Sequence, residues 1–398
     1  MGEPYSIVLN SDENYIKYAS VLITSIIYST ENTKCGNNRP YCFHILSDYI
    51  SDSTQEKLQK LKNRLSKVYP LEIKIHLYDD TKLKHLNALN ENHLAYYRLL
   101  LAKFIKGRKV LYLDVDMLVL KDLREIFNID LEDKICGAVL DYKANRILNP
   151  KNKELPVLKL SKDYFNSGLL LIDLEKWRAQ NIESRLMEIL DKYDCHEHDQ
   201  STLNAILKNK VKILPLSWNT LVYYYANAKT YDETKNFNLF YTRKALNQAL
   251  KDPHILHYYL NFKPWNDDKI YRDTKGEFLG SYWWNIAENI QEFKDELMPL
   301  KTKASQKALS QVSLGYILLV LARYRLHFLI PFYMLTFKDS NSHKEPPQDS
   351  YNLCFEIGKE ALKAKQKGKG RVWLLPFKII NLINRFKIAK TKIFDPTI

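Results

Sequence analysis

Residues 108–116 read Arg-Lys-Val-Leu-Tyr-Leu-Asp-Val-Asp, a short apolar run followed by two acidic residues one position apart. The run Lys109–Leu113 predicts a buried strand. Carboxylates at the end of such a strand are costly unless they are paired or bind a metal. Because alternate residues of an extended chain point to the same side, Asp114 and Asp116 can both reach one divalent cation, which can also take phosphate oxygens of a substrate. The alternative is an ordinary turn with two solvated aspartates.

Strand-like and helix-like segments alternate on both sides of this stretch. Expected strands are Ser6–Asn10, Tyr41–Leu46, Leu71–Tyr78, Lys109–Leu113, Ala138–Leu140, Gly168–Leu174, Val211–Pro215 and Ile255–Tyr259. Expected helices are Asn14–Ser29, Ser53–Leu65, His93–Ile105, Leu174–Tyr193 and Asp199–Leu207. This alternation predicts the α/β class, with a mostly parallel central sheet flanked by helices. Ligands of such sheets bind beyond the carboxyl ends of strands, which is where Asp114 lies.

The composition narrows the kinds of site that the chain can hold. Only 11 of the 398 residues are glycine, and neither G-x-G-x-x-G nor a P-loop pattern occurs, so a glycine-cradled dinucleotide or P-loop site is not expected. The five cysteines, at positions 35, 42, 136, 195 and 354, are scattered, which indicates reduced thiols in a cytoplasmic setting rather than a disulfide framework or a zinc ribbon. The first five residues, Met-Gly-Glu-Pro-Tyr, do not resemble a secretory signal peptide.

The net charge of +14 is concentrated at the C-terminal end. Residues 299–398 hold 18 Lys/Arg and 6 Asp/Glu, whereas residues 1–298 are nearly neutral. We therefore expect a catalytic domain over 1–298 and a helical, basic extension over 299–398.

Apolar segments interrupt the basic extension. Residues 314–337 contain two apolar runs around Arg323 and Arg325. Further along, a basic cluster from Lys363 to Arg371 leads into residues 372–387, where basic residues alternate with apolar ones, including Trp373, Leu374, Phe377, Ile379 and Ile380. Two central arginines argue against a membrane-spanning helix, and the mixture favours helices that lie on an anionic membrane surface. The polar residues 338–350 are expected to link the two segments. The alternatives are a helical appendage packed on the domain or on a partner, and nucleic-acid binding, which nothing in residues 1–298 supports.

Five further blocks of sequence form a pattern together with residues 108–119. They are Ile-Val-Leu-Asn-Ser-Asp-Glu-Asn-Tyr at 7–15, Tyr-Tyr-Arg-Leu at 96–99, Tyr-Phe-Asn-Ser-Gly-Leu-Leu-Leu-Ile-Asp-Leu-Glu-Lys-Trp-Arg at 164–178, His-Asp-Gln-Ser-Thr-Leu-Asn at 198–204 and His-Tyr-Tyr-Leu-Asn-Phe-Lys-Pro-Trp at 257–265. In this order they resemble the family 8 glycosyltransferases, retaining galactosyl- and glucosyltransferases of bacterial lipopolysaccharide assembly with relatives in glycogenin. The resemblance covers about residues 5–265. It implies a GT-A type fold, a UDP-hexose donor and a Mn²⁺ or Mg²⁺ cofactor.

The first block is similar to the family's nucleotide loop. The resemblance implies that Asp12 hydrogen-bonds the uracil edge, that Tyr15 stacks on the base and that Asn10 lines the pocket. It also places Asn14 and Val115 among the donor-binding residues. The alternative for this block is a strand, a turn and a helix N-cap formed by Asp12 or Asn14.

The middle blocks imply the residues around the donor sugar. Arg98 is expected near the donor phosphates and sugar, with a structural salt bridge as the alternative, since an arginine among apolar residues needs a partner. Asn166 and Ser167 are expected to touch the sugar hydroxyls. The resemblance also implies catalytic and donor-binding roles for Asp199, which binds sugar hydroxyls, and for Gln200, which lies beside the anomeric carbon.

The last block is implied to complete the metal site. A neutral imidazole is a suitable ligand beside two carboxylates, so His257 is expected to join Asp114 and Asp116. Lys263 is expected to neutralise the leaving diphosphate. The sequence departs from the family at Leu260, where the family has a glycine that lets the backbone approach the diphosphate.

These expectations combine into one enzyme, which moves galactose or glucose from a UDP-sugar to a lipid-linked or oligosaccharide acceptor with retention of configuration. The resemblance implies lipopolysaccharide or lipooligosaccharide biosynthesis. The tail suits peripheral attachment to the cytoplasmic face of the inner membrane. Two alternatives stay open: a UDP-sugar-binding protein without transferase activity, suggested by Leu260, and a self-glucosylating protein like glycogenin.

Overall fold

The computed structural model describes residues 2–31, 39–86, 93–141, 163–193, 198–227, 241–260, 262–336 and 350–386. The chain forms two compact units. The first comprises residues 1–220, 232–257 and 290–293, and the second comprises 221–231, 258–289 and 294–398. The expected domain boundary at residues 298 and 299 lies inside a helix of the second unit, and stays a prediction.

The first unit is built on a seven-stranded sheet with the order β3-β2-β1-β4-β7-β6-β8. The strands are β1 Tyr5–Asn10, β2 Tyr41–Ser47, β3 Leu71–Leu77, β4 Lys109–Leu113, β6 Cys136–Leu140, β7 Phe165–Asp173 and β8 Val211–Ile213. All neighbours pair in parallel except β7, which is antiparallel to both β4 and β6. The expected mostly parallel α/β sheet is therefore confirmed, with one reversed strand that the sequence pattern did not show.

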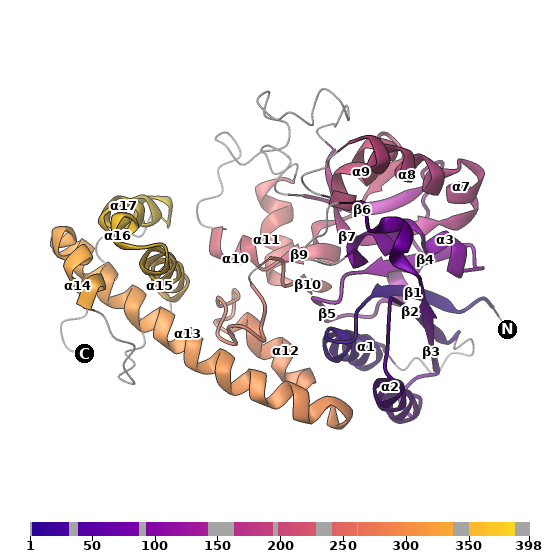
Figure 1. The fold of residues 1–398 in the computed structure, drawn as a ribbon, viewed down its shortest axis with the longest axis horizontal. Helices are drawn as coiled ribbons and strands as arrows, with labels where there is room; N and C mark the ends of the chain where they lie inside the picture. Colours follow the sequence, from indigo (N-terminus) through magenta and orange to yellow (C-terminus); the bar gives the residue numbers. More distant parts are fainter. Residues whose placement is uncertain are drawn as a thin grey trace. The chain divides into compact units, whose positions relative to one another are not determined.

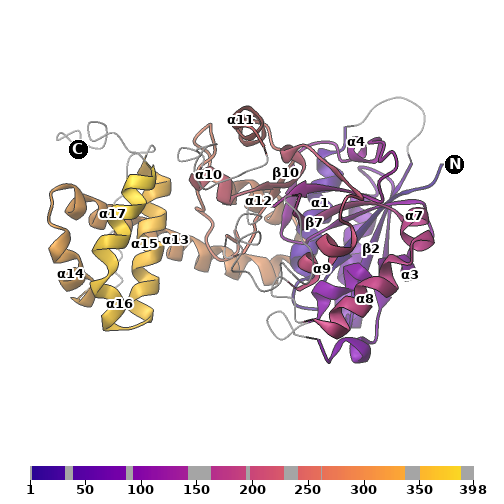
Figure 2. The same cartoon turned by 90° about the horizontal axis from the view of Figure 1, so that it is seen from above.

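Helices cover both faces of this sheet (Figures 1 and 2). The helices of the first unit are α1 Ile16–Ser29, α2 Asp52–Leu65, α3 Leu101–Phe104, α4 Arg124–Phe127, α7 Leu174–Ala179, α8 Ile182–Lys192, α9 His198–Ile206 and α11 Arg243–Lys251. On one face, side chains of β1, β4 and β7 form a single apolar core with residues of α7, α8 and α9. Figure 1 shows α1 and α2 on the opposite side.

Two expected helices are wrong in detail. The segment expected as one helix over His93–Ile105 is a 3₁₀ helix at Leu94–Leu99 followed by the short α3. Residues 96–101 are all buried, so this segment lacks the solvent-facing side that a surface helix keeps. The segment expected as one helix over Leu174–Tyr193 is divided into α7 and α8, because Asn181 adopts a left-handed conformation with φ 49°.

A second, three-stranded sheet lies beyond the end of β4. It has the order β5-β10-β9, with β5 Met117–Val119, β10 Ile255–His257 and β9 Thr220–Leu221. β5 and β10 are antiparallel, and His257 pairs with Met117. The expected strand at Ile255–Tyr259 therefore ends two residues early, and this pairing carries His257 to the residues that follow β4.

The second unit is helical. Its helices are α10 Tyr223–Asn227, α12 Leu279–Ala287, α13 Lys294–Arg323, α14 Ile330–Thr336, α15 Tyr351–Gln366, α16 Lys369–Trp373 and α17 Leu375–Phe386. α13 and α15 cross in close contact, because a Cβ on Gly315 would lie 1.7 Å from the carbonyl oxygen of Cys354. Leu314 and Leu318 are buried. The first apolar run of the extension therefore belongs to the core of this unit rather than to a membrane-facing surface.

Most of the expected linker at 338–350 lies outside the described residues. Within the ranges given above, none of the helices has the length and hydropathy that a membrane crossing requires.

Candidate active site

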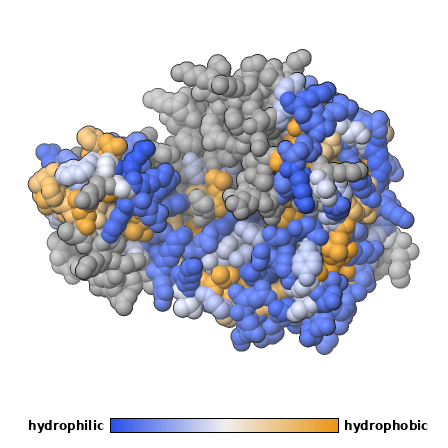
Figure 3. All heavy atoms as spheres, in the orientation of Figure 1, coloured by the Kyte–Doolittle hydropathy of each residue, from blue (hydrophilic) through white to orange (hydrophobic). Residues whose placement is uncertain are grey.

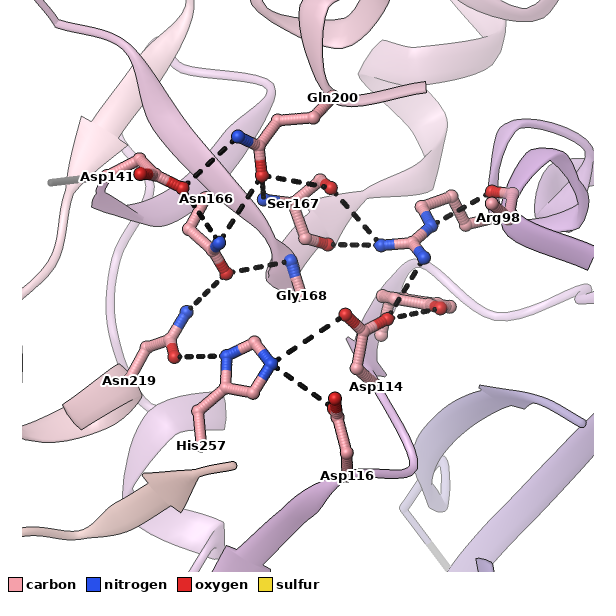
Figure 4. Close-up of polar contacts among 12 residues, drawn as sticks. Arg98, Asp114, Asp116, Asp141, Asn166, Ser167, Gly168, Gln200, Asn219 and His257 are labelled. Carbon is pink, nitrogen blue, oxygen red and sulfur yellow. Dashed lines mark hydrogen bonds and ion pairs between the residues drawn. The ribbon is translucent and has the colours of Figure 1, made fainter. Parts of the chain in front are cut away.

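Two carboxylates and one imidazole meet where β4, β5 and β10 come together. Asp114 directly follows β4, Asp116 directly precedes β5 and His257 ends β10. His257 Nε2 lies 3.2 Å from Asp116 Oδ1 and 4.0 Å from Asp114 Oδ2 (Figure 4). One potential ligand atom from each residue lies within 4.8 Å of the other two. This set of two carboxylates and one imidazole fits a divalent ion such as Mn²⁺.

Gly168 provides the room for this cluster. It lies in β7, and its carbonyl oxygen accepts a hydrogen bond of 2.8 Å from the backbone N–H of Asp114. A Cβ at this position would lie 2.7 Å from His257 Cε1 and 2.8 Å from Asp114 Oδ2. Both distances are shorter than van der Waals contact, so any other residue would push the side chains of His257 and Asp114 apart.

Arg98 connects the acidic residues of the site. It is buried, and its guanidinium lies 3.0 Å from Asp114 Oδ1 and 3.2 Å from Asp199 Oδ2. It also donates to the carbonyl oxygen of Ser167 at 2.9 Å, and lies over the ring of Tyr112. Burial opposes its charge, but Asp114 and Asp199 outweigh burial and raise the pKa of Arg98. The salt-bridge alternative is therefore present, and it holds both aspartates in place.

Several hydrogen bonds hold the side chain of Gln200 at the start of α9. Its Oε1 accepts from the backbone N–H of Ser167 at 3.0 Å and from Asn166 Nδ2 at 3.3 Å. Its Nε2 donates to Asp141 Oδ2 at 3.1 Å. Asn166 donates to the same carboxylate at 2.9 Å. The sequence-predicted residues Asn166, Ser167 and Gln200 therefore form one buried cluster around Asp141.

Asp141 and Asn219 are site residues that sequence reasoning missed. Asp141 directly follows β6, which runs parallel to β4, so the signal that singled out Asp114 after β4 applies to Asp141 as well. Asn219 ends a short 3₁₀ helix and contacts His257 (Figure 4). No local pattern distinguishes it, because its role depends on residues far away in the sequence.

The first sequence block forms the expected strand, turn and helix, but the N-cap of α1 is Tyr15, without a side-chain cap hydrogen bond, rather than Asp12 or Asn14. Asp12 Oδ1 accepts a hydrogen bond of 2.8 Å from the backbone N–H of Tyr15, which closes the turn before α1. Asn10 is buried at the end of β1, and its amide donates to the carbonyl oxygen of Leu94 at 2.7 Å. The roles of Asp12 and Asn10 toward a nucleobase stay predictions.

Tyr15 directly precedes α1, and its side chain is partly exposed. Burial, and after it the charges of Asp116 and Asp12, raise the pKa of its phenol. Asn14 and Val115 are the other two residues expected to bind the donor. Asn14 is exposed, whereas Val115 is buried.

Leu260 and Lys263 belong to the second unit. Leu260 adopts φ 53°, in the left-handed region that glycine enters readily and that costs other residues about 1–2 kcal/mol. The backbone at the family's glycine position therefore keeps a glycine-like conformation despite the leucine side chain. The role of Lys263 toward a diphosphate stays a prediction.

The order and spacing of these residues match a known family. The model of glycosyl transferase family 8 matches residues 6–269. The chain belongs to this family. This match confirms the resemblance expected over about residues 5–265. The protein is therefore a glycosyltransferase.

Individual relatives agree with this assignment. The family 8 chain is 30% identical over 295 residues to a lipopolysaccharide 1,2-glucosyltransferase of Escherichia coli, covering 71% of this chain and 80% of that protein. It is 27% identical over 296 residues to general stress protein A of Bacillus subtilis, covering 71% of this chain and 96% of that protein. The crystal structure of galactosyltransferase LgtC with donor and acceptor sugar analogues superimposes with a TM-score of 0.57 at 23% identity, covering 73% of this chain and all of that one. The expected GT-A type fold is confirmed.

Proposed function

We propose that the protein is a retaining hexosyltransferase that moves galactose or glucose from a UDP-sugar to a saccharide acceptor, using Mn²⁺ or Mg²⁺. The observation that carries this proposal is the convergence of Asp114, Asp116 and His257 around the backbone of Gly168. Such a site, in a family 8 glycosyltransferase, suits a diphosphate donor, because hard divalent cations bind through carboxylates and substrate phosphates together.

A bound ion would supply Lewis-acid stabilisation of the negative charge that develops on the UDP leaving group. Arg98 keeps Asp114 in place for that ion and adds positive charge of its own. Lys263 is the second cation proposed to act on the diphosphate. Strong stabilisation of the leaving group is what this reaction needs, since the sugar carbon becomes cationic as the glycosidic phosphate bond breaks.

Asp199 and Gln200 are the residues proposed to act at the sugar. Asp199, held by Arg98 and the Ser167 hydroxyl, binds sugar hydroxyls together with Asn166 and Ser167. The side-chain amide oxygen of Gln200 stabilises the cationic carbon while the acceptor hydroxyl attacks the face from which UDP departs. The leaving phosphate takes the proton of that hydroxyl. An amide oxygen is a weak nucleophile, so this proposal contains no covalent sugar–Gln200 intermediate.

The nucleoside of the donor is proposed to bind at the first block. Tyr15 stacks on the uracil and Asp12 hydrogen-bonds its edge. The nearby Asn10, Asn14 and Val115 line the pocket. The charge of Asp116 acts on the Tyr15 phenol, and this interaction supports a base-binding site on the same side as the proposed metal site.

The acceptor is proposed to be a lipid-linked or oligosaccharide precursor in lipopolysaccharide or lipooligosaccharide biosynthesis. The name of the Escherichia coli relative supports this acceptor class. The proposed location is the cytoplasmic face of the inner membrane, with the second unit against the lipid.

The surface of the second unit supports this location. Aromatic and aliphatic side chains are exposed on its last helices and the turn before them; they are Phe328, Leu329, Phe332, Leu335, Trp373, Leu374, Phe377 and Ile380. Figure 3 shows part of this apolar surface. Phe332 of α14 and Trp373 of α16 meet edge to face, with ring centroids 5.3 Å apart, so the two helices share one apolar surface. Exposed basic residues accompany it, including Lys367, Arg371 and Lys378. Apolar side chains with flanking positive charge suit an anionic lipid surface.

The transfer reaction can be tested by UDP release from a panel of UDP-sugars, with and without Mn²⁺, in the presence of a lipid-linked saccharide extract. We expect metal-dependent release from UDP-galactose or UDP-glucose. Metal-dependent UDP binding without release from any sugar would overturn the proposal in favour of a binding protein. Transfer of sugar onto the protein itself, rather than onto the extract, would favour the self-glucosylating alternative.

The membrane surface can be tested on the full-length protein with vesicles that contain phosphatidylglycerol. We expect the Trp373→Ser/Phe377→Ser variant to bind at least about tenfold more weakly, since each large apolar side chain contributes about 1.5–3 kcal/mol when fully buried. The matched control is Tyr49→Ser/Leu77→Ser, which removes two exposed apolar side chains from the first unit. Equal binding by the wild type and the Trp373/Phe377 variant would show that this surface does not meet the membrane.

A further inference from the structure

A chain of buried side-chain hydrogen bonds links Asp141 to His257 (Figure 4). Asn166 Nδ2 donates to Asp141 Oδ2 at 2.9 Å, and Asn219 Nδ2 donates to Asn166 Oδ1 at 2.8 Å. Asn219 Oδ1 then faces His257 Nδ1 at 2.9 Å. All four residues are at most 2% exposed, so water does not substitute for these partners.

The contacts of Asn166 fix which group donates and which accepts in this series of hydrogen bonds. A backbone N–H can only donate, and that of Gly168 donates to Asn166 Oδ1 at 3.1 Å. The carboxylate of Asp141 accepts the opposite end of the same amide. These two contacts leave one possible orientation of Asn166, with its oxygen toward Asn219.

The orientation of Asn219 follows from that of Asn166. Its Nδ2 must face the Asn166 oxygen, so its own oxygen must face His257. A reversed Asn219 would place its own oxygen against the Asn166 oxygen, and neither oxygen could donate to the other. Each unsatisfied buried polar group costs about 1–3 kcal/mol.

We propose that Asn219 is a positioning residue that holds His257 in the tautomer with the proton on Nδ1. The lone pair of Nε2 is then directed at the space shared with Asp114 and Asp116. This inference rests on the metal site of the proposed function and adds the residue that prepares its imidazole ligand. Asp141 and Asn166, which also contact Gln200, provide the fixed end of the chain.

The decisive variant is Asn219→Leu, which has a similar size and no acceptor for Nδ1–H. We expect its affinity for Mn²⁺, measured by electron paramagnetic resonance without substrate, to fall about 10–100-fold, as is typical when the hydrogen-bond partner of a metal-binding histidine is lost. The Asn219→Asp variant keeps an acceptor toward His257 but loses the donor to Asn166 Oδ1, so we expect it to lose less affinity than Asn219→Leu. The control is Thr220→Val, which removes a neighbouring buried hydroxyl that bonds to the Leu216 carbonyl oxygen.

The tautomer itself can be read from ¹⁵N spectra of histidine-labelled, metal-free protein at about pH 9, where an ordinary imidazole is neutral. We expect the His257 signals to show a proton on Nδ1 in the wild type and a mixture of tautomers in Asn219→Leu, a change that a loss of packing alone does not produce. Unchanged Mn²⁺ affinity and an unchanged tautomer in Asn219→Leu would overturn this inference. A wild-type protein that does not bind Mn²⁺ would instead overturn the proposed metal site.

Discussion

The Asp116→Asn variant is expected to release UDP from the donor at least about 1000-fold more slowly than the wild type, because the substitution removes one of two anionic ligands and with it several kcal/mol of leaving-group stabilisation. The carboxylate lies 3.2 Å from His257 Nε2, so its position is central to the cluster. The amide has nearly the same shape, so the loss reports charge rather than packing. The measurement is metal-dependent UDP release under saturating donor.

The matched control for this charge change is Asp133→Asn, since Asp133 is an exposed surface residue whose carboxylate pairs with the adjacent Lys134. We expect its rate to equal that of the wild type. If Asp116→Asn kept its metal-dependent rate, the carboxylate would not be a ligand and the proposed site would be wrong.

The Gly168→Ala variant is expected to lose Mn²⁺ affinity and turnover together, by about 100-fold. Its added methyl group would lie 2.7 Å from His257 Cε1 and 2.8 Å from Asp114 Oδ2, so the side chains that hold the ion must separate. Over-packing of this kind destabilises a structure by about 1–3 kcal/mol, and displacement of the ligands also disturbs the geometry of a metal site. The measurements are Mn²⁺ binding and UDP release on the same preparation.

Gly107→Ala is the control for a glycine-to-alanine change in the same unit, because the nearest atoms to its new Cβ lie 3.8 and 3.9 Å away. We expect wild-type Mn²⁺ binding and a wild-type rate from this variant. Wild-type Mn²⁺ affinity in Gly168→Ala would mean that the ion does not sit between Asp114 and His257.

The strands around the site were predictable because their apolar runs are local. The strand at Lys109–Leu113 has the expected bounds, and the two aspartates that follow it lie beside each other as their spacing required. Segments that other parts of the fold cover on several sides were predicted less well. The residues around Arg98 form a 3₁₀ helix, and because Tyr96–Leu99 are all buried, no single helical face marks them in the sequence.

The direction of β7 was also beyond the sequence pattern. A strand that is buried on both faces reads as the same apolar run in either direction, so Phe165–Asp173 gave no sign that it is antiparallel to its neighbours. Its reversal matters for the site, because it brings the Asn166, Ser167 and Gly168 backbone past the end of β4.

The sequence by itself determined the α/β class, the basic extension and the residue types of a metal and donor site, since periodicity, charge and motif order are properties of the chain alone. The tertiary structure decided which of those residues meet and in which orientation. His257 joins Asp114 and Asp116 through the pairing of β10 with β5. The orientation of Asn219 toward His257 follows from Asn166, whose amide is fixed by Gly168 and Asp141. Hydrogen-bond direction depends on every partner in a buried network at once, and those partners come from strands that are neighbours only after folding.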